Sequence, residues 1–157
     1  MKPFQIVRLG AEHNRASFTC GQEALDRYLR NQATQDIRRY VANCFVAVES
    51  ATGRVAAYYT LAATSVPLID LPAEVTKKLP CYPVVPAVLI GRLAVDLAFQ
   101  GQGLGRVLLV DAVRQVLAAA PAAHLLLVDA KDEGAARFYR RNGFIPLESR
   151  PLTLFQT

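Results

Sequence analysis

The spacing of hydrophobic positions changes along the chain, and each spacing predicts a type of element. Imperfect alternation of apolar and polar residues over residues 4–9 predicts a first β-strand. Residues 43–49 and 55–64 predict two antiparallel strands joined by a turn at residues 51–54. Between the first two strands, a polar loop leads into helical spacing, which we expect to form one helix or two. The apolar positions with this spacing are Leu25, Tyr28, Leu29, Ala33, Ile37, Tyr40 and Val41.

The second half of the chain alternates strands and helices. In order, the pattern predicts strand 88–97, helix 103–119, strand 124–128, helix 132–141 and two short strands at 144–145 and 152–155. Asp132 is a residue type that caps a helix N-terminus, and Gly143 is the type that follows a helix end. The helix at 103–119 is apolar over most of its circumference, so we expect it to pack under the sheet.

Residues 64–86 interrupt this order. They contain five prolines and one short helix candidate at residues 73–79. A loop of this length usually has a function beyond connecting two elements. We therefore expect it to cover the binding site of an acceptor substrate or to mediate dimerisation.

These elements predict an α/β fold in which a central mixed β-sheet is flanked by helices. At 157 residues the chain has the length of one domain, and we expect residues 1–157 to form it. No apolar run reaches the length of a membrane span and no signal peptide opens the chain, so we expect a cytoplasmic protein. The odd and widely spaced cysteines, Cys20, Cys44 and Cys81, predict neither a disulfide framework nor a zinc site.

The net charge of +5 favours polyanionic partners such as CoA, phosphorylated substrates or nucleic acid, although many small basic proteins bind none of these. Two interpretations of the arginines opposite the apolar helical positions remain open: a solvated helix face, or a stripe that contacts phosphates. These arginines are Arg27, Arg30, Arg38 and Arg39. His13 and His124 each lack a ligand-spaced partner, so we expect no metal site.

Three alternate glycines lie between the predicted strand at 88–97 and the following helix. Such a loop lets backbone N–H groups converge on a phosphate, and the helix dipole adds positive potential. A P-loop is excluded because Arg106, and not Lys with Ser or Thr, follows Gly105. A dinucleotide-binding fold would need more chain after Asp129 than remains. The remaining pattern, Gln/Arg-x-x-Gly-x-Gly/Ala, is satisfied by Gln100, Gly101, Gln102, Gly103, Leu104 and Gly105.

This loop resembles the acyl-CoA loop of the GNAT N-acetyltransferase superfamily, and residues 135–144 resemble the family's A-x-x-F-Y-x-x-x-G-F segment. Together the two motifs imply the GNAT fold and acetyl-CoA as co-substrate, with no metal. The resemblance implies that the cofactor-binding residues are Leu93, Ala94, Val95, Gln100, Gly101, Gln102, Gly103, Leu104, Gly105, Arg106, Asp132, Ala135 and Phe138. Many members carry Asn where this chain has Asp132. Because Asp and Asn both cap helix N-termini, we expect Asp132 to cap the helix whether or not it contacts the cofactor.

Acetyl transfer from a thioester to an amine needs a neutral amine, a hydrogen-bond donor for the oxyanion and a proton for the departing thiolate. The family resemblance implies that Tyr139 supplies this proton. A phenol with an ordinary pKa of about 10 is protonated at neutral pH, which suits a general acid. No general base stands out, because Asp96 and Glu49 are carboxylates near strand ends that we expect to be solvated.

The chain also resembles a branch of the superfamily, the toxins of type II toxin–antitoxin pairs that acetylate the α-amine of aminoacyl-tRNA. The residues that carry this resemblance are Phe18, Cys20, Gly21, Leu25, Asp26, Leu29, Tyr58, Tyr59, 91–96, 128–130, Phe138 and Tyr139. It implies translation arrest, a ribbon-helix-helix antitoxin as partner, and a homodimer. An aminoacyl α-amine is less basic than a lysine side chain, so a missing general base costs little. The tRNA-binding residues would be Arg8, Arg15, Arg27, Arg30, Arg38 and Arg39.

Two alternatives remain open. The first keeps the fold and the chemistry but acetylates a small amine or a protein N-terminus. The second is a catalytically silent acyl-CoA-binding regulatory module, or a DNA-binding partner in a repressor complex.

Overall fold

A computed structural model describes residues 3–79 and 82–157. Cys81, one of the three cysteines, and Pro80, one of the prolines of the 64–86 segment, lie outside the described residues. The helices are α1 (Glu23–Asn31), α2 (Ala33–Arg38), α3 (Ala73–Thr76), α4 (Leu104–Ala118) and α5 (Glu133–Arg141), with 3-10 turns η1 (Leu68–Asp70) and η2 (Leu97–Phe99). The strands are β1 (Phe4–Arg8), β2 (Asn43–Glu49), β3 (Val55–Pro67), β4 (Val84–Val95), β5 (Leu125–Asp129), β6 (Ile145–Pro146) and β7 (Thr153–Gln156).

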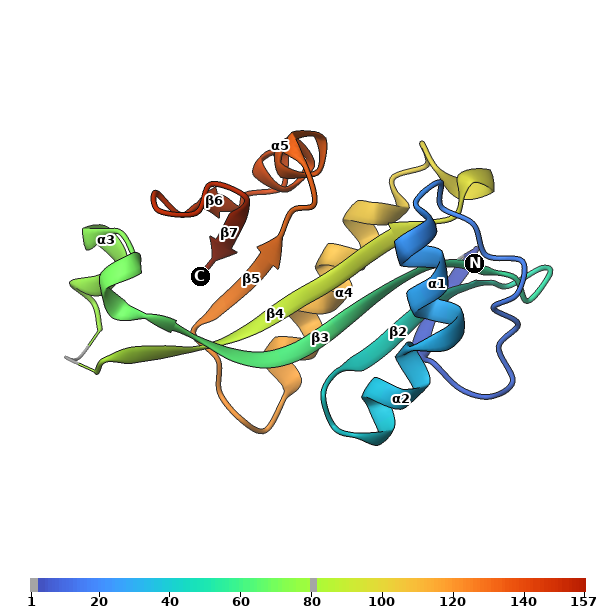
Figure 1. The fold of residues 1–157 in the computed structure, drawn as a ribbon, viewed down its shortest axis with the longest axis horizontal. Helices are drawn as coiled ribbons and strands as arrows, with labels where there is room; N and C mark the ends of the chain where they lie inside the picture. Colours follow the sequence, from blue (N-terminus) through green and yellow to red (C-terminus); the bar gives the residue numbers. More distant parts are fainter. Residues whose placement is uncertain (1–2, 80–81) are drawn as a thin grey trace. The chain divides into compact units, whose positions relative to one another are not determined.

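The strands follow the order β1-β2-β3-β4-β5-β7-β6, and the fold is a mixed sheet with helices, as the sequence predicts (Figure 1). The chain divides into two compact units, and β3, β4 and α4 each have residues in both. The first unit is Met1–Ala62 with Gly91–Ala112, and the second is Ala63–Ile90 with Val113–Thr157.

In the first unit, β1, β2 and the first part of β3 pair antiparallel, with Arg8 opposite Phe45 and Phe45 opposite Tyr59. Successive side chains of a strand point to opposite faces. Tyr58 therefore points toward α1, where its hydroxyl donates a hydrogen bond to the Leu25 carbonyl (2.7 Å). Tyr59 points the other way, and its hydroxyl donates to Asp111 on α4 (2.6 Å). Neighbouring tyrosines thus fix helices on the two faces of these strands.

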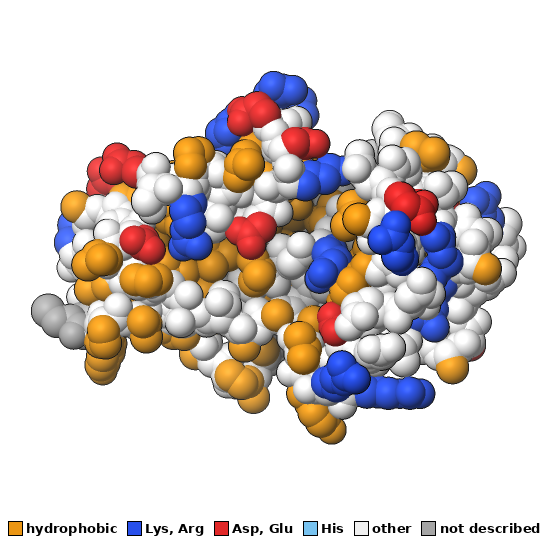
Figure 2. Space-filling model, viewed as in Figure 1, with side chains coloured by type: hydrophobic (Ala, Val, Ile, Leu, Met, Phe, Trp, Pro, Cys, Tyr) orange, Lys and Arg blue, Asp and Glu red, His pale blue; other side chains and the backbone are white. Residues whose placement is uncertain are grey.

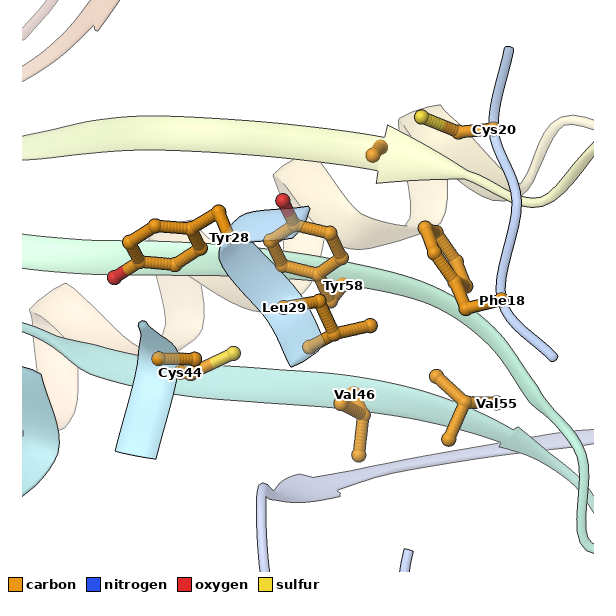
Figure 3. Packing of buried hydrophobic residues seen from close by; sticks show 10 residues of the cluster. Phe18, Cys20, Tyr28, Leu29, Cys44, Val46, Val55 and Tyr58 are labelled. Carbon is orange, nitrogen blue, oxygen red and sulfur yellow. The ribbon is translucent and has the colours of Figure 1, made fainter. Parts of the chain in front are cut away.

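The core between α1 and the strands is aromatic (Figure 3). Phe18 meets the Tyr58 ring edge to face, with centroids 5.5 Å apart, and Tyr28 stacks on it at 6.3 Å. Leu29 is completely buried beside them, and Cys44 is buried on β2. Cys20 and Cys44 both belong to this core.

The second unit is built on β5, whose residues Leu125 to Val128 are all buried. It pairs parallel to β4 and antiparallel to β7, which in turn pairs with β6. Phe155 and Leu147 complete a core that is separate from that of the first unit. Unbroken apolar character is typical of a strand covered on both faces.

Several predicted boundaries are wrong. Helical spacing suggested that Tyr40 and Val41 continue the helix, but α2 ends at Arg38 and both side chains are exposed. The segment 64–86 is less irregular than expected, because β3 runs to Pro67 and β4 begins at Val84. The central strand ends at Val95 rather than Leu97. The capping prediction for α5 is confirmed: Asp132 is its N-cap, and Gly143 follows its end with φ +92°.

Within the described parts of the chain, no helix is both long and apolar enough to cross a membrane.

Replacement of Leu29 by Ala should lower the free energy of unfolding by about 2–5 kcal/mol, because it leaves a cavity in a packed core. The matched control is Leu117→Ala on α4, where the leucine is 81% exposed and the loss should stay within about 0.5 kcal/mol. Urea unfolding followed by circular dichroism measures both. Equal losses in the two variants would contradict the assignment of the core.

Candidate active site

The segment that leaves β4 is held by Asp96, whose side chain is 1% exposed. Its carboxylate accepts hydrogen bonds from the backbone N–H groups of Thr19 (3.0 Å) and Ala98 (2.9 Å). The Arg54 guanidinium lies 3.8 Å from the same carboxylate and covers the Phe99 ring. We expected Asp96 to be solvated and considered it as a base, but it is buried and committed to backbone donors, so its role is structural.

Cys20, Gly21, Leu25 and Asp26, which carry part of the resemblance, form a Cys-Gly-x-x-x-Leu-Asp element before and within α1. Asp26, also buried, accepts a hydrogen bond from the Cys20 N–H group (2.9 Å), which folds the chain before α1 back on that helix. Gln100 then donates its side-chain amide to the carbonyls of Cys20 (3.2 Å) and Val95 (2.9 Å). These hydrogen bonds fix the start of the glycine loop to the segment before α1, and the Gln100 side chain supplies two of them.

The glycine loop leads directly into α4. Gly101 and Gly103 have φ values of +80° and +77°, which L side chains rarely adopt, and an added Cβ at either would meet no atom within 4 Å. The first N–H groups of a helix have no intrahelical acceptor, and the first backbone bond of this helix is Val107 N–H to the Gly103 carbonyl (3.3 Å). Gln102 and Arg106 are exposed. An open loop that leads into a helix N-terminus, with an exposed cation beside it, fits a diphosphate.

The end of β4 extends beyond its pairing with β5. The register of the two strands runs from Ala87 opposite Leu125 to Ile90 opposite Val128, whereas β4 continues to Val95. The backbone groups of Leu93, Ala94 and Val95 therefore follow the last β4 residue that is paired with β5. These are three of the residues that the family resemblance implies for binding of acyl-CoA.

Arg92 lies in the stretch 91–96 that carries the resemblance, but the sequence alone predicts no separate role for it. Its N–H group donates to the Thr60 hydroxyl (3.1 Å), and its guanidinium carbon lies 3.7 Å from the centroid of the Tyr28 ring. The Tyr28 hydroxyl donates to Asp36 (2.7 Å). Burial, with the Asp36 hydrogen bond, raises the pKa of Tyr28, and hydrogen bonds from Tyr28 and Gln32 lower the pKa of Asp36. This cluster depends on contacts far apart in the sequence, and periodicity carries no signal for it.

In the second unit, α5 presents the residues of the second motif. The Asp132 carboxylate accepts a hydrogen bond from the Ala135 N–H group (2.8 Å), as predicted for an N-cap. Phe138 is partly buried and its ring lies 5.4 Å from that of Tyr139, and Phe144 packs against the same tyrosine at 5.7 Å. The rotamer of Tyr139 is therefore restricted by aromatic contacts on two sides.

Tyr139 is 6% exposed, and burial together with the Asp129 carboxylate raises its pKa to about 12. In the described part of the chain, the Tyr139 hydroxyl has no hydrogen-bond partner. Its oxygen is not fully enclosed by protein atoms, so it touches solvent. The phenol therefore keeps its proton at neutral pH.

The six predicted tRNA-binding arginines do not all lie on one face of the first unit. Arg8 lies over the Phe45 ring (5.4 Å), on the face of the strands opposite α1 and α2. Arg15 donates to the Leu29 carbonyl (3.0 Å) and to Thr34 (2.9 Å), which ties the loop to both helices. Arg30 donates to the Phe18 carbonyl (3.4 Å) and, like Arg27, contacts Glu23.

Arg27, Arg38 and Arg39 are exposed, and no ion pair holds Arg38 or Arg39 within the described residues. In the space-filling view, Lys and Arg side chains gather over α1 and α2 (Figure 2). Among the described residues, Arg38 and Arg39 are therefore the exposed members of the predicted set without an ion pair, whereas the exposed Arg27 lies 3.8 Å from Glu23.

Other candidate groups have local roles. Glu49 accepts a hydrogen bond from Thr52 in the β2–β3 turn (2.6 Å). His13 accepts one from the Gly10 N–H group (2.9 Å). The backbone N–H group of His124 donates to the Pro86 carbonyl (2.9 Å). Among the described residues, no group of three or more His, Cys, Asp or Glu side chains is arranged so that it could hold a metal ion.

The mixed sheet, the glycine loop at a helix start and the tyrosine on α5 define an acyltransferase of the GNAT type. Residues 41–146 match the family described as the acetyltransferase (GNAT) domain. The chain belongs to the GNAT acetyltransferase family.

Three relatives share nearly the whole chain. A tRNA-acetylating toxin of Mycobacterium tuberculosis is 39% identical over 140 residues, which cover 88% of this chain and 82% of the relative. A tyrosine-to-phenylalanine variant of KacT has a TM-score of 0.91 and 31% identity over 99% of this chain and 95% of the other. AtaT complexed with acetyl-methionyl-tRNA has a TM-score of 0.88 and 32% identity over 98% of this chain and 94% of the other.

AtaT is also known in a second complex. A tyrosine-to-phenylalanine variant bound to acetyl-CoA and to the C-terminus of the antitoxin AtaR has a TM-score of 0.83 and 29% identity, over 99% of this chain and 93% of the other.

Replacement of Asp132 by Ala should lower the free energy of unfolding by about 1 kcal/mol, because the Ala135 N–H group loses its acceptor. Asp132→Asn keeps a side-chain oxygen at the same place and should stay close to the parent protein. Thermal unfolding of the three proteins measures the difference. If Asn destabilises as much as Ala, then the charge, and not the cap, is what matters at this position.

Proposed function

We propose that this protein transfers the acetyl group of acetyl-CoA to the α-amine of aminoacyl-tRNA and so acts as the translation-blocking toxin of a type II toxin–antitoxin pair. The observation that carries the transfer chemistry is Tyr139, a phenol with a buried ring, a raised pKa and a hydroxyl that touches solvent. The tRNA acceptor is supported by the 39% identical relative named a tRNA-acetylating toxin and by the exposed arginines of α1 and α2.

The donor side rests on the end of β4 and the glycine loop. The backbone N–H groups from Gly101 to Arg106 would hold the CoA diphosphate, with the start of α4 contributing its positive dipole end. Leu93, Ala94 and Val95 would bind the pantetheine arm and the thioester carbonyl through their backbones. The Gln100 side chain supports this stretch, because it already bonds the Cys20 and Val95 carbonyls.

Tyr139 would act as the general acid that protonates the departing CoA thiolate. Its pKa of about 12 keeps it protonated over the whole physiological range, so the acid is present whenever the donor is bound. No carboxylate is proposed as general base, since Asp96 is committed to structure. An aminoacyl α-amine is weakly basic enough to arrive partly neutral, which is consistent with a site that lacks a base.

The acceptor side is proposed to use exposed cations. Lys and Arg contacts to phosphates dominate the binding of RNA backbones, and this binding weakens with salt. Arg27, Arg38 and Arg39 are exposed on the α1–α2 surface and suit that role. For Arg15 and Arg30, hydrogen bonds to backbone carbonyls make a supporting role the better proposal.

The proposal extends to the setting of the enzyme. Residues 1–157 would act as a single acetyltransferase domain in the cytoplasm, where charged tRNA is found. The partner would be an antitoxin of the ribbon-helix-helix type, and the active form a homodimer. AtaT, bound in one structure to the C-terminus of its antitoxin, supports the existence of such a partner.

The direct experiment incubates the purified protein with radiolabelled acetyl-CoA and bulk aminoacyl-tRNA, then identifies the labelled aminoacyl-adenosine by mass spectrometry. The proposal expects label on the α-amine of the amino acid. Label transferred to a panel of small amines, with none in RNA, would establish the rival substrate class instead.

Tyr139→Phe should reduce kcat by about 10²- to 10⁴-fold, because the ring contacts are kept and only the transferable proton is lost. The KM for acetyl-CoA should hardly change. Tyr58→Phe is the control, since it removes another tyrosine hydroxyl, one that bonds the Leu25 carbonyl, and should lower stability rather than kcat. Steady-state kinetics would refute the general acid if Tyr139→Phe kept the kcat of the parent enzyme.

Reversal of both charges at Arg38 and Arg39 to Glu should raise the KM for aminoacyl-tRNA and should reduce the slope of log KM against log salt by about two. Lys77→Glu with Lys78→Glu is the matched control, because it reverses an adjacent pair of lysines and changes the net charge equally. The same salt dependence in both double variants would remove these arginines from the tRNA surface.

A further inference from the structure

The turn between α2 and β2 exposes an aromatic side chain. Tyr40 is 96% exposed, and the next residue, Val41, is 58% exposed. Tyr40 is also the only non-glycine residue with positive φ (58°) among the described residues. Two exposed apolar residues thus lie at a backbone turn that the core does not cover.

The conformation of this turn is one that favours glycine. The N–H groups of Tyr40 and Val41 donate to the carbonyls of Ile37 (3.2 Å) and Asp36 (2.9 Å), which closes the end of α2. A residue in the left-handed region just past a helix end is usually Gly, sometimes Asn, because a side chain there is strained. No packing inside the molecule compensates for a tyrosine that is almost fully exposed. Backbone strain of this kind persists where it serves a function. Glycine would relieve the strain but would lack the aromatic ring, so we assign the function to the ring.

The charge around the ring selects the type of partner. Arg38 and Arg39 precede Tyr40 directly and are both exposed, without an ion pair to any carboxylate that the structure describes. They lie on the α1–α2 surface, over which basic side chains gather (Figure 2). An apolar protein surface would have to desolvate both guanidinium groups. A nucleotide satisfies them with phosphates while it offers the ring a flat base.

We propose that Tyr40 stacks on an unpaired base of the RNA that this protein acetylates, with Arg38 and Arg39 on the adjacent phosphates. The inference rests on the proposed function and deepens it by naming a base contact that is not electrostatic. Stacking of a base on an aromatic side chain tolerates any base, because every base has a π-face. Tyr40 thereby adds affinity for single-stranded nucleotides without selecting a sequence.

The chain contains no tryptophan, so Tyr40→Trp places a single fluorophore at the proposed contact. The titration uses uncharged bulk tRNA, which binds without turnover. We expect the emission to be quenched in proportion to the RNA bound. Tyr82→Trp, at a position that is 65% exposed in the second unit, is the control and should not be quenched. RNA binding without quenching at position 40 would overturn the inference.

Tyr40→Gly should weaken tRNA binding about tenfold or more. Its unfolding midpoint should be unchanged or higher, because glycine suits a φ of 58°. Tyr40→Phe should restore binding, since it keeps the ring. The slope of log Kd against log salt should be the same in Tyr40→Gly as in the parent protein, in contrast to an arginine variant.

The possible outcomes distinguish a failure of the stacking contact from a failure of the proposed function. If the parent protein acetylates charged tRNA while Tyr40→Gly binds and acetylates it equally well, then only the stacking inference fails. If the parent protein transfers no acetyl group to tRNA, then the proposed function fails and the inference fails with it. A change in Tyr40→Trp emission with protein concentration in the absence of RNA would assign the ring to a contact between two copies of the chain and would also overturn the inference.

Discussion

The buried carboxylate of Asp96 is the constraint on which the donor half of the site depends. A carboxylate that is 1% exposed is tolerated only when its lone pairs are satisfied, and here two backbone N–H groups and a nearby guanidinium do so. Because one of these donors, Thr19, precedes α1 and the other, Ala98, follows β4, the bond fixes two distant parts of the chain to each other. The Thr19 carbonyl returns the contact by accepting from the Leu97 N–H group (2.8 Å).

The Asp96 hydrogen bonds fix the segment that leads from β4 into the glycine loop. Gln100 adds two more hydrogen bonds at the start of the loop, and only then does the chain pass through Gly101 and Gly103 with positive φ. A loop that presents free N–H groups binds an anion well when its conformation is set in advance, because little order must then be created on binding. In the second unit, the conformation of Tyr139 is likewise set in advance, because its ring contacts those of Phe138 and Phe144.

Features that depend on local sequence could be predicted, whereas those that depend on distant contacts could not. The glycine loop, the Asp132 cap and Gly143 after α5 are encoded within a few residues, and the structure has them where they were expected. The family and its fold could also be predicted, because two local motifs identify them. By contrast, Arg15 looks like a surface cation in the sequence, but it reaches a backbone carbonyl. Asp96 looks like a solvated carboxylate until the Thr19 segment folds over it.

The loop from Gln100 to Arg106 is proposed to bind the diphosphate of the acyl donor. Calorimetric titration with coenzyme A tests this most directly when the parent protein is compared with Gly103→Ala, which forces a side chain into a φ of +77° without a steric clash. We predict saturable binding to the parent protein and binding at least about tenfold weaker in the variant, since the N–H groups no longer converge. No binding to the parent protein, or equal affinity in both, would contradict this role of the loop.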